Sequence, residues 1–172
     1  AKTGGDHYVS MFREYQPVEN IESLKYEFKL TWEEIGNKSI KLADIESERN
    51  FKRYIPYKSI LLVTEEDFSK DLEKFIFWIS ELLNINIKII SQDTLLGPDS
   101  NLDLSIFEKI RWIATSQEIP TQIFSSGATI DERGLSQNGK QELLCWVKEQ
   151  SISITNHRYG NIGSGPQPFK DW

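Results

Sequence analysis

One segment constrains the fold more than any other, because a short apolar run at 59–63 leads directly into a long helical pattern. A continuous apolar run is typical of a strand that is covered on both faces. Thr64 and Asp67 form a pattern typical of a helix start, and Asn84 marks the expected end. Between them, apolar residues recur at helical spacing at Phe68, Leu72, Phe75, Ile76, Ile79, Leu82 and Leu83. A second strand is expected at 85–90, so the segment predicts a βαβ unit with parallel strands.

The region before this unit has the alternation of a half-buried strand. In residues 24–32, apolar side chains alternate with polar ones, which predicts a strand with one buried and one solvated face. A partner strand is expected at 8–15, and a third strand at 39–45. Three consecutive strands with short connections predict an antiparallel meander. Residues 46–55 are expected to form a short helix before the apolar run.

The second half of the chain alternates helices and strands. The expected elements are a helix at 102–114, a strand at 120–124, a loop at 125–134, a helix at 138–149 and a strand at 151–155. We therefore expect an α/β fold of three layers, in which a mixed sheet combines an N-terminal antiparallel meander with βαβ units and has helices on both faces. Residues 1–155 are expected to form a single α/β domain, and the Gly- and Pro-rich residues 156–172 an irregular C-terminal tail.

Composition narrows the class of protein. The 172 residues carry a net charge of −6, which argues against broad binding of a nucleic-acid backbone because that requires clustered Lys and Arg. A single cysteine excludes an internal disulfide, and the two histidines make a zinc site unexpected. The longest apolar stretch, 75–83, is shorter than the roughly 20 residues that cross a bilayer. With no secretory signal in the printed sequence, we expect a cytoplasmic protein that does not bind a membrane.

The tripeptide at 27–29 carries the first candidate chemistry. On a strand, Glu27 and Lys29 share a face, where the carboxylate can hold a divalent cation and the lysine can orient the attacking water. With Asp6 upstream and a strand and helix downstream, this pattern resembles the PD-(D/E)xK nucleases over about the first half of the chain. The same two residues also fit the solvated face of an antiparallel strand.

The order of the expected elements offers a second resemblance. Three meandering strands, a helix, and then a strand, helix and strand resemble the ribonuclease H-like fold, which implies acidic metal ligands on its strands and helix. The positions that correspond here are Asp6, Glu46 or Glu48, and Glu65, Glu66 or Asp67. The last three also fit the favourable interaction of acids with a helix N-terminus. Together the two resemblances imply a metal-dependent phosphodiesterase with catalytic Asp6, Glu27, Lys29 and Asp67, whose Mg²⁺ or Mn²⁺ is held by Asp6, Glu27 and Asp67.

Two polar segments are candidate ligand-binding sites. The loop at 125–134 follows an expected strand, the usual place for ligands in open α/β sheets, and its Arg133 can bind an anion. In the tail, His157, Arg158 and Tyr159 combine a cation, a planar fork and a stacking surface, which suit a nucleotide, a peptide or a nucleic-acid end. Alternatively, the segment at 125–134 is a surface loop without a ligand, and the tail packs against its own domain.

No complete catalytic constellation is recognisable in the sequence, and this directs the prediction of function. We expect a non-enzymatic binding or protein-interaction module that needs no cofactor, with the metal-dependent nuclease as the alternative. Phe77 and Trp78 lie off the apolar stripe of their helix, which makes them candidates for contact with another subunit or domain. The chain begins at Ala1 rather than Met, so the expected partner is another protein or a further domain of the same polypeptide, with nucleic acid as another candidate.

Overall fold

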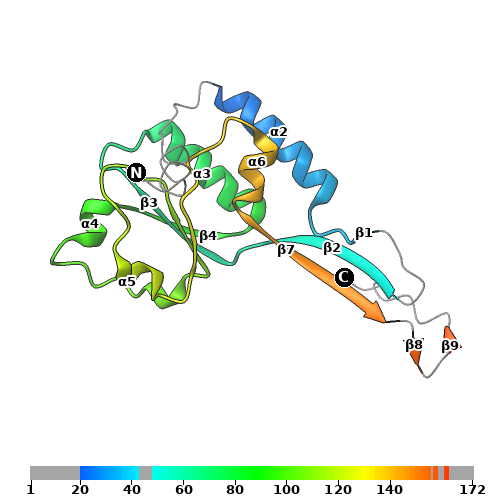
Figure 1. The fold of residues 1–172 in the computed structure, drawn as a ribbon. Helices are drawn as coiled ribbons and strands as arrows, with labels where there is room; N and C mark the ends of the chain where they lie inside the picture. Colours follow the sequence, from blue (N-terminus) through cyan, green and yellow to red (C-terminus); the bar gives the residue numbers. More distant parts are fainter. Residues whose placement is uncertain (1–19, 43–47, 156, 159–160, 163–172) are drawn as a thin grey trace, which may run out of the picture.

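The structure is a computed structural model that describes residues 20–42, 48–155, 157–158 and 161–162 (Figure 1). It combines helices with a four-stranded parallel sheet and a three-stranded antiparallel sheet. The parallel strands lie in the order β4 (Asn86–Ser91), β3 (Ser59–Thr64), β5 (Lys109–Trp112) and β6 (Thr129–Asp131). The antiparallel strands lie in the order β1 (Ile40–Lys41), β2 (Glu48–Pro56) and β7 (Val147–Thr155). The expected mixed α/β fold is therefore confirmed.

The parallel sheet is organised around β3, which lies between β4 and β5. The helix α3 (Lys70–Leu83) connects β3 to β4, and the two strands pair in parallel along their whole length. The predicted βαβ unit is therefore confirmed. The helix begins after Ser69 and not at Thr64, because Thr64 still belongs to the strand and pairs with Ser91. It ends as predicted at Asn84, which adopts the left-handed conformation that often closes a helix.

Alternate residues of β3 contribute to two separate cores, so the parallel sheet is covered on both faces (Figure 1). Ile60 and Leu62 pack against the apolar side of α3. Leu61 and Val63 point to the other face. There they join a core completed by the short helices α4 (Gln92–Leu96) and α5 (Thr121–Phe124). This arrangement gives the three layers expected from the sequence.

The segment predicted as a strand at 24–32 is a helix, α2 (Ile21–Ile35), so the strand prediction is wrong. The segment carries two periodicities at once, because its apolar residues satisfy both an alternating and a helical spacing. The helical set faces the core and consists of Ile21, Leu24, Phe28, Trp32 and Ile35. Two apolar residues of the alternating set, Tyr26 and Leu30, remain 67% and 47% exposed. Asn20 caps the helix by accepting a hydrogen bond from a first-turn amide at 3.0 Å.

The predicted N-terminal meander is not formed by the described residues, and the antiparallel sheet is assembled differently. β2 occupies most of the segment predicted as a helix at 46–55, and it pairs with β7 from far along the chain. Its other neighbour is the two-residue strand β1, which lies within the strand predicted at 39–45. The strand predicted at 8–15 lies outside the described residues. The many charged residues of β2 suit a strand whose two faces are both partly solvated.

Three predictions between β4 and α6 are also wrong. The helix expected at 102–114 is replaced by a 3₁₀ turn, η1 (Leu104–Ile106), followed by β5. The strand expected at 120–124 is the helix α5, and the loop expected at 125–134 contains β6. The charged residues of β5 occupy what would be the polar side of an amphipathic helix, yet in the strand they are buried as ion pairs.

The last helix and strand follow the prediction more closely. The helix α6 (Gly139–Leu144) begins at the predicted Asn138 cap but is shorter than expected, because β7 already begins at Val147. A short antiparallel pair, β8 (His157–Arg158) and β9 (Asn161–Ile162), lies within the tail predicted as irregular. Among the described residues, none of the helices has both the length and the apolar character needed to cross a membrane.

The helices α2 and α6 pack closely, and Gly139 is a point of contact between them. A Cβ atom on Gly139 would lie 2.5 Å from the backbone nitrogen of Phe28 and closer still to Cβ of Glu27. We therefore expect Gly139→Ala to lower the free energy of unfolding by about 1–3 kcal/mol, the usual cost of overpacking. Urea denaturation followed by circular dichroism measures this change.

A matched control for this substitution is Gly127→Asn. Gly127 has a φ of +84°, and a Cβ atom added there would meet nothing within 4 Å. A side chain at this positive φ is strained even without a clash, but Asn tolerates the conformation better than most residues, so the control should cost no more than about 1 kcal/mol. A Gly139→Ala variant as stable as the wild type would contradict the close contact of α2 with α6.

Candidate functional site

The order of the parallel strands creates a switch point between β3 and β5. From β3 the chain crosses to β4 on one side, and it then returns past β3 to form β5 on the other side. Open α/β sheets bind ligands in the crevice at the carboxyl ends of the two strands that flank such a point. Glu65 follows β3 directly, and Thr115 and Ser116 follow β5. We refer to the space around these residues as the switch-point crevice.

The carboxylate of Glu65 binds the loop after β5, at the end of the sheet where open α/β folds commonly bind their ligands. Its Oε1 accepts hydrogen bonds from the backbone amides of Thr115 at 2.5 Å and Ser116 at 2.9 Å. Its Oε2 accepts hydrogen bonds from Oγ of Ser116 at 2.8 Å and from Nε2 of Gln92 at 3.0 Å. Backbone amides in such loops are donors that commonly cradle phosphate groups. Here a side chain of the same molecule occupies them.

Negative charge accumulates in this crevice. Partial burial alone would raise the pKa of Glu65, but the hydrogen bonds from Thr115 and Ser116 hold it below the usual value of a glutamate. The adjacent cavity, of 370 Å³, is lined by a second acid, Asp67, together with Phe68 and Ile113. The switch-point crevice is therefore acidic and two of its backbone donors are occupied, so it disfavours a phosphate group.

A fully buried ion pair joins β5 to α6. Nη1 of Arg111 lies 2.5 Å from Oε1 of Glu142, and Nη2 donates to Oε2 at 3.1 Å. Glu142 also accepts hydrogen bonds from Nε1 of Trp146 at 2.9 Å and from the amide of Ser136 at 2.7 Å. Burying two charges is costly unless further hydrogen bonds satisfy them, and both oxygens of this carboxylate have such additional partners. The pair therefore fixes α6 and the loop that precedes it against the parallel sheet.

A second charge cluster, Lys109–Asp131–Arg133, lies at the edge strand β6. Oδ2 of Asp131 lies 2.8 Å from Nζ of Lys109 and 2.6 Å from Nη2 of Arg133, and Oδ1 accepts from Nε of Arg133 at 2.9 Å. Burial raises the pKa of Asp131, but the two cations outweigh it and hold the pKa well below its usual range. Arg133, the predicted anion-binding residue, is thus clamped in one orientation while 51% of its side chain stays exposed.

The structure does not bring the predicted nuclease residues together. Glu27 and Lys29 lie on the helix α2 and not on a strand, and a spacing of two residues places them about 200° apart around the helix axis. Glu27 instead accepts a hydrogen bond from the amide of Gly139 at 2.9 Å. Asp67 lines the cavity beside the switch-point crevice, and Asp6 lies outside the described residues. Within the described ranges, no three or more His, Cys, Asp or Glu side chains are grouped to hold a metal ion.

The remaining predicted residues have other positions. Glu65, Glu66 and Asp67 precede the first turn of α3, so their predicted interaction with the start of that helix is wrong. Glu48 lies in β2 opposite Thr155, and Glu46 lies outside the described residues. Of the predicted tail residues, His157 and Arg158 form β8, whereas Tyr159 lies outside the described residues.

The sequence analysis did not identify the charged residues that form the buried ion pairs of the fold. Lys109, Arg111 and Glu142 were not singled out, because charged residues are rarely buried and their partners lie far away in the sequence. The available signal was the alternation of two cations with two apolar residues along 109–112, which fits a short strand as well as a helix.

The two aromatic residues predicted to contact a partner differ in their surroundings. Trp78 packs against Phe28 and Phe75, with ring centroids 5.5 Å and 6.0 Å away, so it is explained within the chain. Phe77 remains 64% exposed on α3. Only Phe77 therefore keeps the surface position that the prediction required.

Comparison with known proteins identifies a related fold and no family. No protein-family model matches the sequence, and no curated protein matches it. Solved structures with a similar fold include Proline Utilization A (PutA) from Corynebacterium freiburgense, with a TM-score of 0.57 and 21% sequence identity. The match covers 88% of this chain but only 15% of the PutA chain. At this level of identity the likeness shows the fold alone.

The geometry of the crevice predicts that the Glu65 carboxylate stabilises the protein. Glu65→Gln replaces one accepting oxygen by a donor and removes the charge, so we expect the free energy of unfolding at pH 7 to fall by about 1–3 kcal/mol. Glu66→Gln is the matched control, because Glu66 is the exposed neighbour and should change stability little. Urea denaturation of the three proteins measures both effects.

The pH dependence of this difference follows from the lowered pKa of Glu65. A carboxylate with a lower pKa in the folded state contributes stability above its unfolded pKa and loses it as the pH falls through the folded pKa. The gap between wild type and Glu65→Gln should therefore narrow as the pH drops below about 4.3, the ordinary value for glutamate. A gap that stays constant down to pH values of about 2 would contradict the assigned role.

Proposed function

We propose that this chain is a non-enzymatic interaction domain that binds a protein partner through the ribbon formed by β1, β2 and β7. The observation that carries the proposal is the outer edge of β7, which no strand of the described residues pairs with. The other edge of β7 pairs with β2 along all nine residues of the strand, from Val147 opposite Pro56 to Thr155 opposite Glu48.

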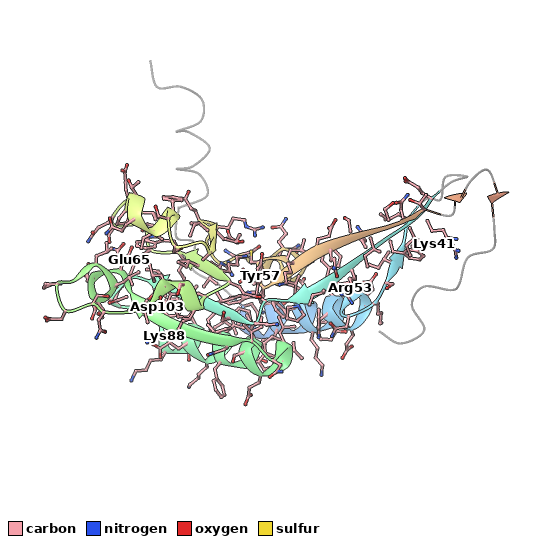
Figure 2. All side chains as sticks on the ribbon, turned by 90° about the horizontal axis from the view of Figure 1, so that it is seen from below. Lys41, Arg53, Tyr57, Glu65, Lys88 and Asp103 are labelled. Carbon is pink, nitrogen blue, oxygen red and sulfur yellow. The ribbon has the colours of Figure 1, made fainter. Side chains whose placement is uncertain are left out.

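The ribbon projects away from the helices, as Figures 1 and 2 show. None of the described residues of β2 is fully buried, and neither is any residue of β7 after Val147. The third strand, β1, pairs with only two residues of β2, so most of the ribbon is two-stranded. Two strands alone are only marginally stable in water, and they gain stability when they pack on another surface. The projecting part of the ribbon is therefore the element of this fold that gains most from a partner.

The edge of β7 has few of the features that usually prevent strand pairing. Natural edge strands are commonly protected by lysine, proline or a bulge. The outer half, residues 151–155, has the sequence Ser-Ile-Ser-Ile-Thr, without a charge or a proline. Its pairing with β2 proceeds without a bulge. Such an edge can accept a further strand, which is a common mode of peptide and domain recognition.

One face of the ribbon adds side-chain specificity to this edge. Phe51 lies directly opposite Ile152, and residues two apart on a strand share a face, so Ile154 lies on the same side. Arg49 and Arg53 occupy neighbouring positions on this face, opposite Ile154 and Gln150. An apolar strip flanked by cations favours a partner strand that carries apolar and acidic side chains.

The acidic switch-point crevice supports a non-enzymatic role, because it disfavours phosphate at the place where related architectures usually bind a ligand. The partner in this proposal is a second copy of the chain, because the unpaired edge of β7 in one chain can pair with the identical edge in another.

The isolated chain provides a direct test, because a second copy is always present in solution. We expect reversible self-association in sedimentation velocity experiments between about 10 µM and about 1 mM. Ile152→Lys should weaken the association tenfold or more, since burying one isoleucine contributes roughly 1.5–3 kcal/mol and a tenfold change needs about 1.4 kcal/mol.

Ser153→Lys is the matched control, because it adds the same charge on the opposite face of the same strand. It should change the association less than Ile152→Lys does. A chain that stays monomeric over the whole concentration range, or equal effects of the two lysines, would contradict the proposed use of this ribbon face.

A further inference from the structure

A pocket of 420 Å³ opens beside the edge strand β6 and is separate from the projecting half of the ribbon. Tyr57, in the connection from β2 to β3, lies where the two sheets meet (Figure 2). The side chains that line this β6 pocket come from Tyr57, β5, β6 and the residues around the start of β7. The pocket therefore lies between the parallel sheet and the base of the ribbon.

Three cations converge on this pocket. Nζ of Lys109 lies 5.0 Å and Nζ of Lys148 5.5 Å from the centre of the Tyr57 ring. The third cation, Arg133, shares the single carboxylate of Asp131 with Lys109. One carboxylate between two cations leaves the Lys109–Asp131–Arg133 cluster with a net positive charge.

The guanidinium group of Arg133 is prepared to bind an anion. Asp131 accepts hydrogen bonds from Nε and Nη2 of this side chain. Among the described residues, none accepts a hydrogen bond from Nη1. Because the clamp already fixes the side chain, little conformational entropy remains to be lost on binding. The half-exposed position of the side chain gives a ligand access to it.

The other acids at the pocket already have donors of their own. Glu149 accepts a hydrogen bond from the hydroxyl of Tyr54 at 3.0 Å. Glu108, just outside the lining, accepts from the amide of Lys58 at 2.7 Å and lies 3.3 Å from Nζ of Lys148. The apolar part of the lining consists of the Tyr57 ring, Ile130, Leu144 and Val147.

From this combination we infer that the β6 pocket binds a small organic anion, in which a carboxylate or phosphate group is attached to an apolar body. Arg133 and Lys148 hold the anionic group, and the Tyr57 ring with the aliphatic side chains contacts the body. This ligand site is independent of the proposed association through the ribbon.

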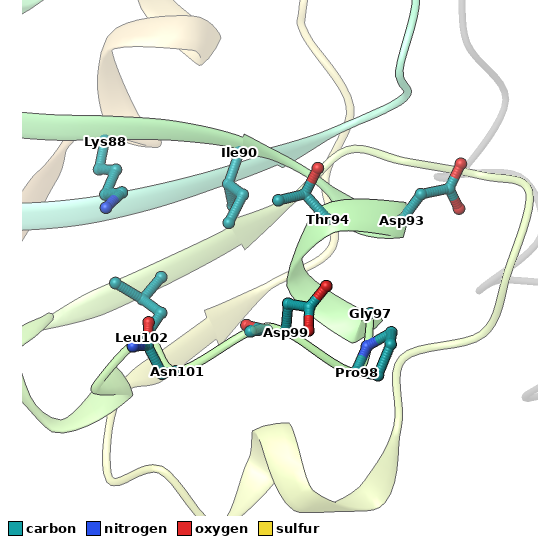
Figure 3. Close-up of a pocket in the computed structure, with 10 residues that line it drawn as sticks. Lys88, Ile90, Asp93, Thr94, Gly97, Pro98, Asp99, Asn101 and Leu102 are labelled. Atoms are coloured by element: carbon teal, nitrogen blue, oxygen red, sulfur yellow. The ribbon is translucent and has the colours of Figure 1, made fainter.

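The pocket at the opposite edge of the sheet serves as an internal comparison (Figure 3). It has a similar volume, 390 Å³, and lies beside β4. Its charged lining residues are one lysine, Lys88, and two acids, Asp93 and Asp99. The sign of the charge therefore differs between the two pockets, and the same anion should not bind beside β4.

The test uses benzoate as the organic anion, benzamide as its neutral analogue and inorganic phosphate as an anion without an apolar body. In two-dimensional NMR titrations of the intact chain, benzoate should shift the amides of residues 129–133 and saturate with a dissociation constant of about 1 mM or below. Benzamide and phosphate should each bind at least about tenfold more weakly, because each lacks one half of the recognised group.

Three variants locate the binding site. Arg133→Gln and Lys148→Gln should each weaken benzoate binding, with a loss of about tenfold or more for Arg133→Gln. Lys88→Gln removes the same charge at the opposite edge of the sheet and should change binding less than about twofold. Because Lys148 is more loosely held than Arg133, Lys148→Gln keeps the test decisive if Arg133→Gln fails to fold.

Each other outcome would overturn the inference. Without a saturable shift from benzoate, the pocket would be only a structural charge cluster. Equal binding of benzamide would show that the cations take no part, and equal binding of phosphate would show that the apolar walls take none. Loss of binding in Lys88→Gln alone would place the ligand beside β4.

Discussion

The hydrogen bonds that the Glu65 carboxylate accepts from the loop after β5 restrict which ligands can bind at the switch point of the parallel sheet. Glu65 follows β3, and its partners Thr115 and Ser116 follow the neighbouring strand, so the contact bridges the switch point of the sheet. Open α/β sheets commonly bind a ligand's phosphate in such a crevice. Here a carboxylate of the protein itself occupies the backbone donors, so the crevice carries negative charge. The fold keeps the three-layer framework, and the surfaces that we propose for binding lie elsewhere, on the ribbon and beside β6.

Two charge clusters, one fully buried and one partly exposed, connect this framework to those surfaces. The Arg111–Glu142 pair fixes α6 against β5, and α6 in turn contacts α2 at Gly139. The Lys109–Asp131–Arg133 cluster ties β5 to the edge strand β6. Buried ion pairs contribute little net stability, but removing one partner leaves an uncompensated buried charge, which is strongly destabilising. The base of the ribbon is therefore held by directional contacts, while its outer half has few contacts of its own.

The parts of the fold that local pattern determines were predictable from the sequence. The apolar run of β3 and the helical spacing of α3 agree with each other, and the structure confirms both. In α2 two periodicities compete, and the alternating one was misleading because Tyr26 and Leu30 are apolar yet exposed. β5 was missed because its charges are buried by partners more than 20 residues away in the chain. For the same reason the role of Glu65 could not be predicted, since its partners are separated from it by 50 and 51 residues.

The most direct test of this account follows the backbone amides of Thr115 and Ser116 by NMR while the pH is lowered and, separately, while inorganic phosphate is added. If Glu65 occupies these donors, both amide resonances should shift together with one apparent pKa below about 4.3, and phosphate should leave them unchanged. The account would be contradicted if the two amide resonances did not change as Glu65 titrates and instead shifted saturably with phosphate. That result would show that the crevice is open to a ligand.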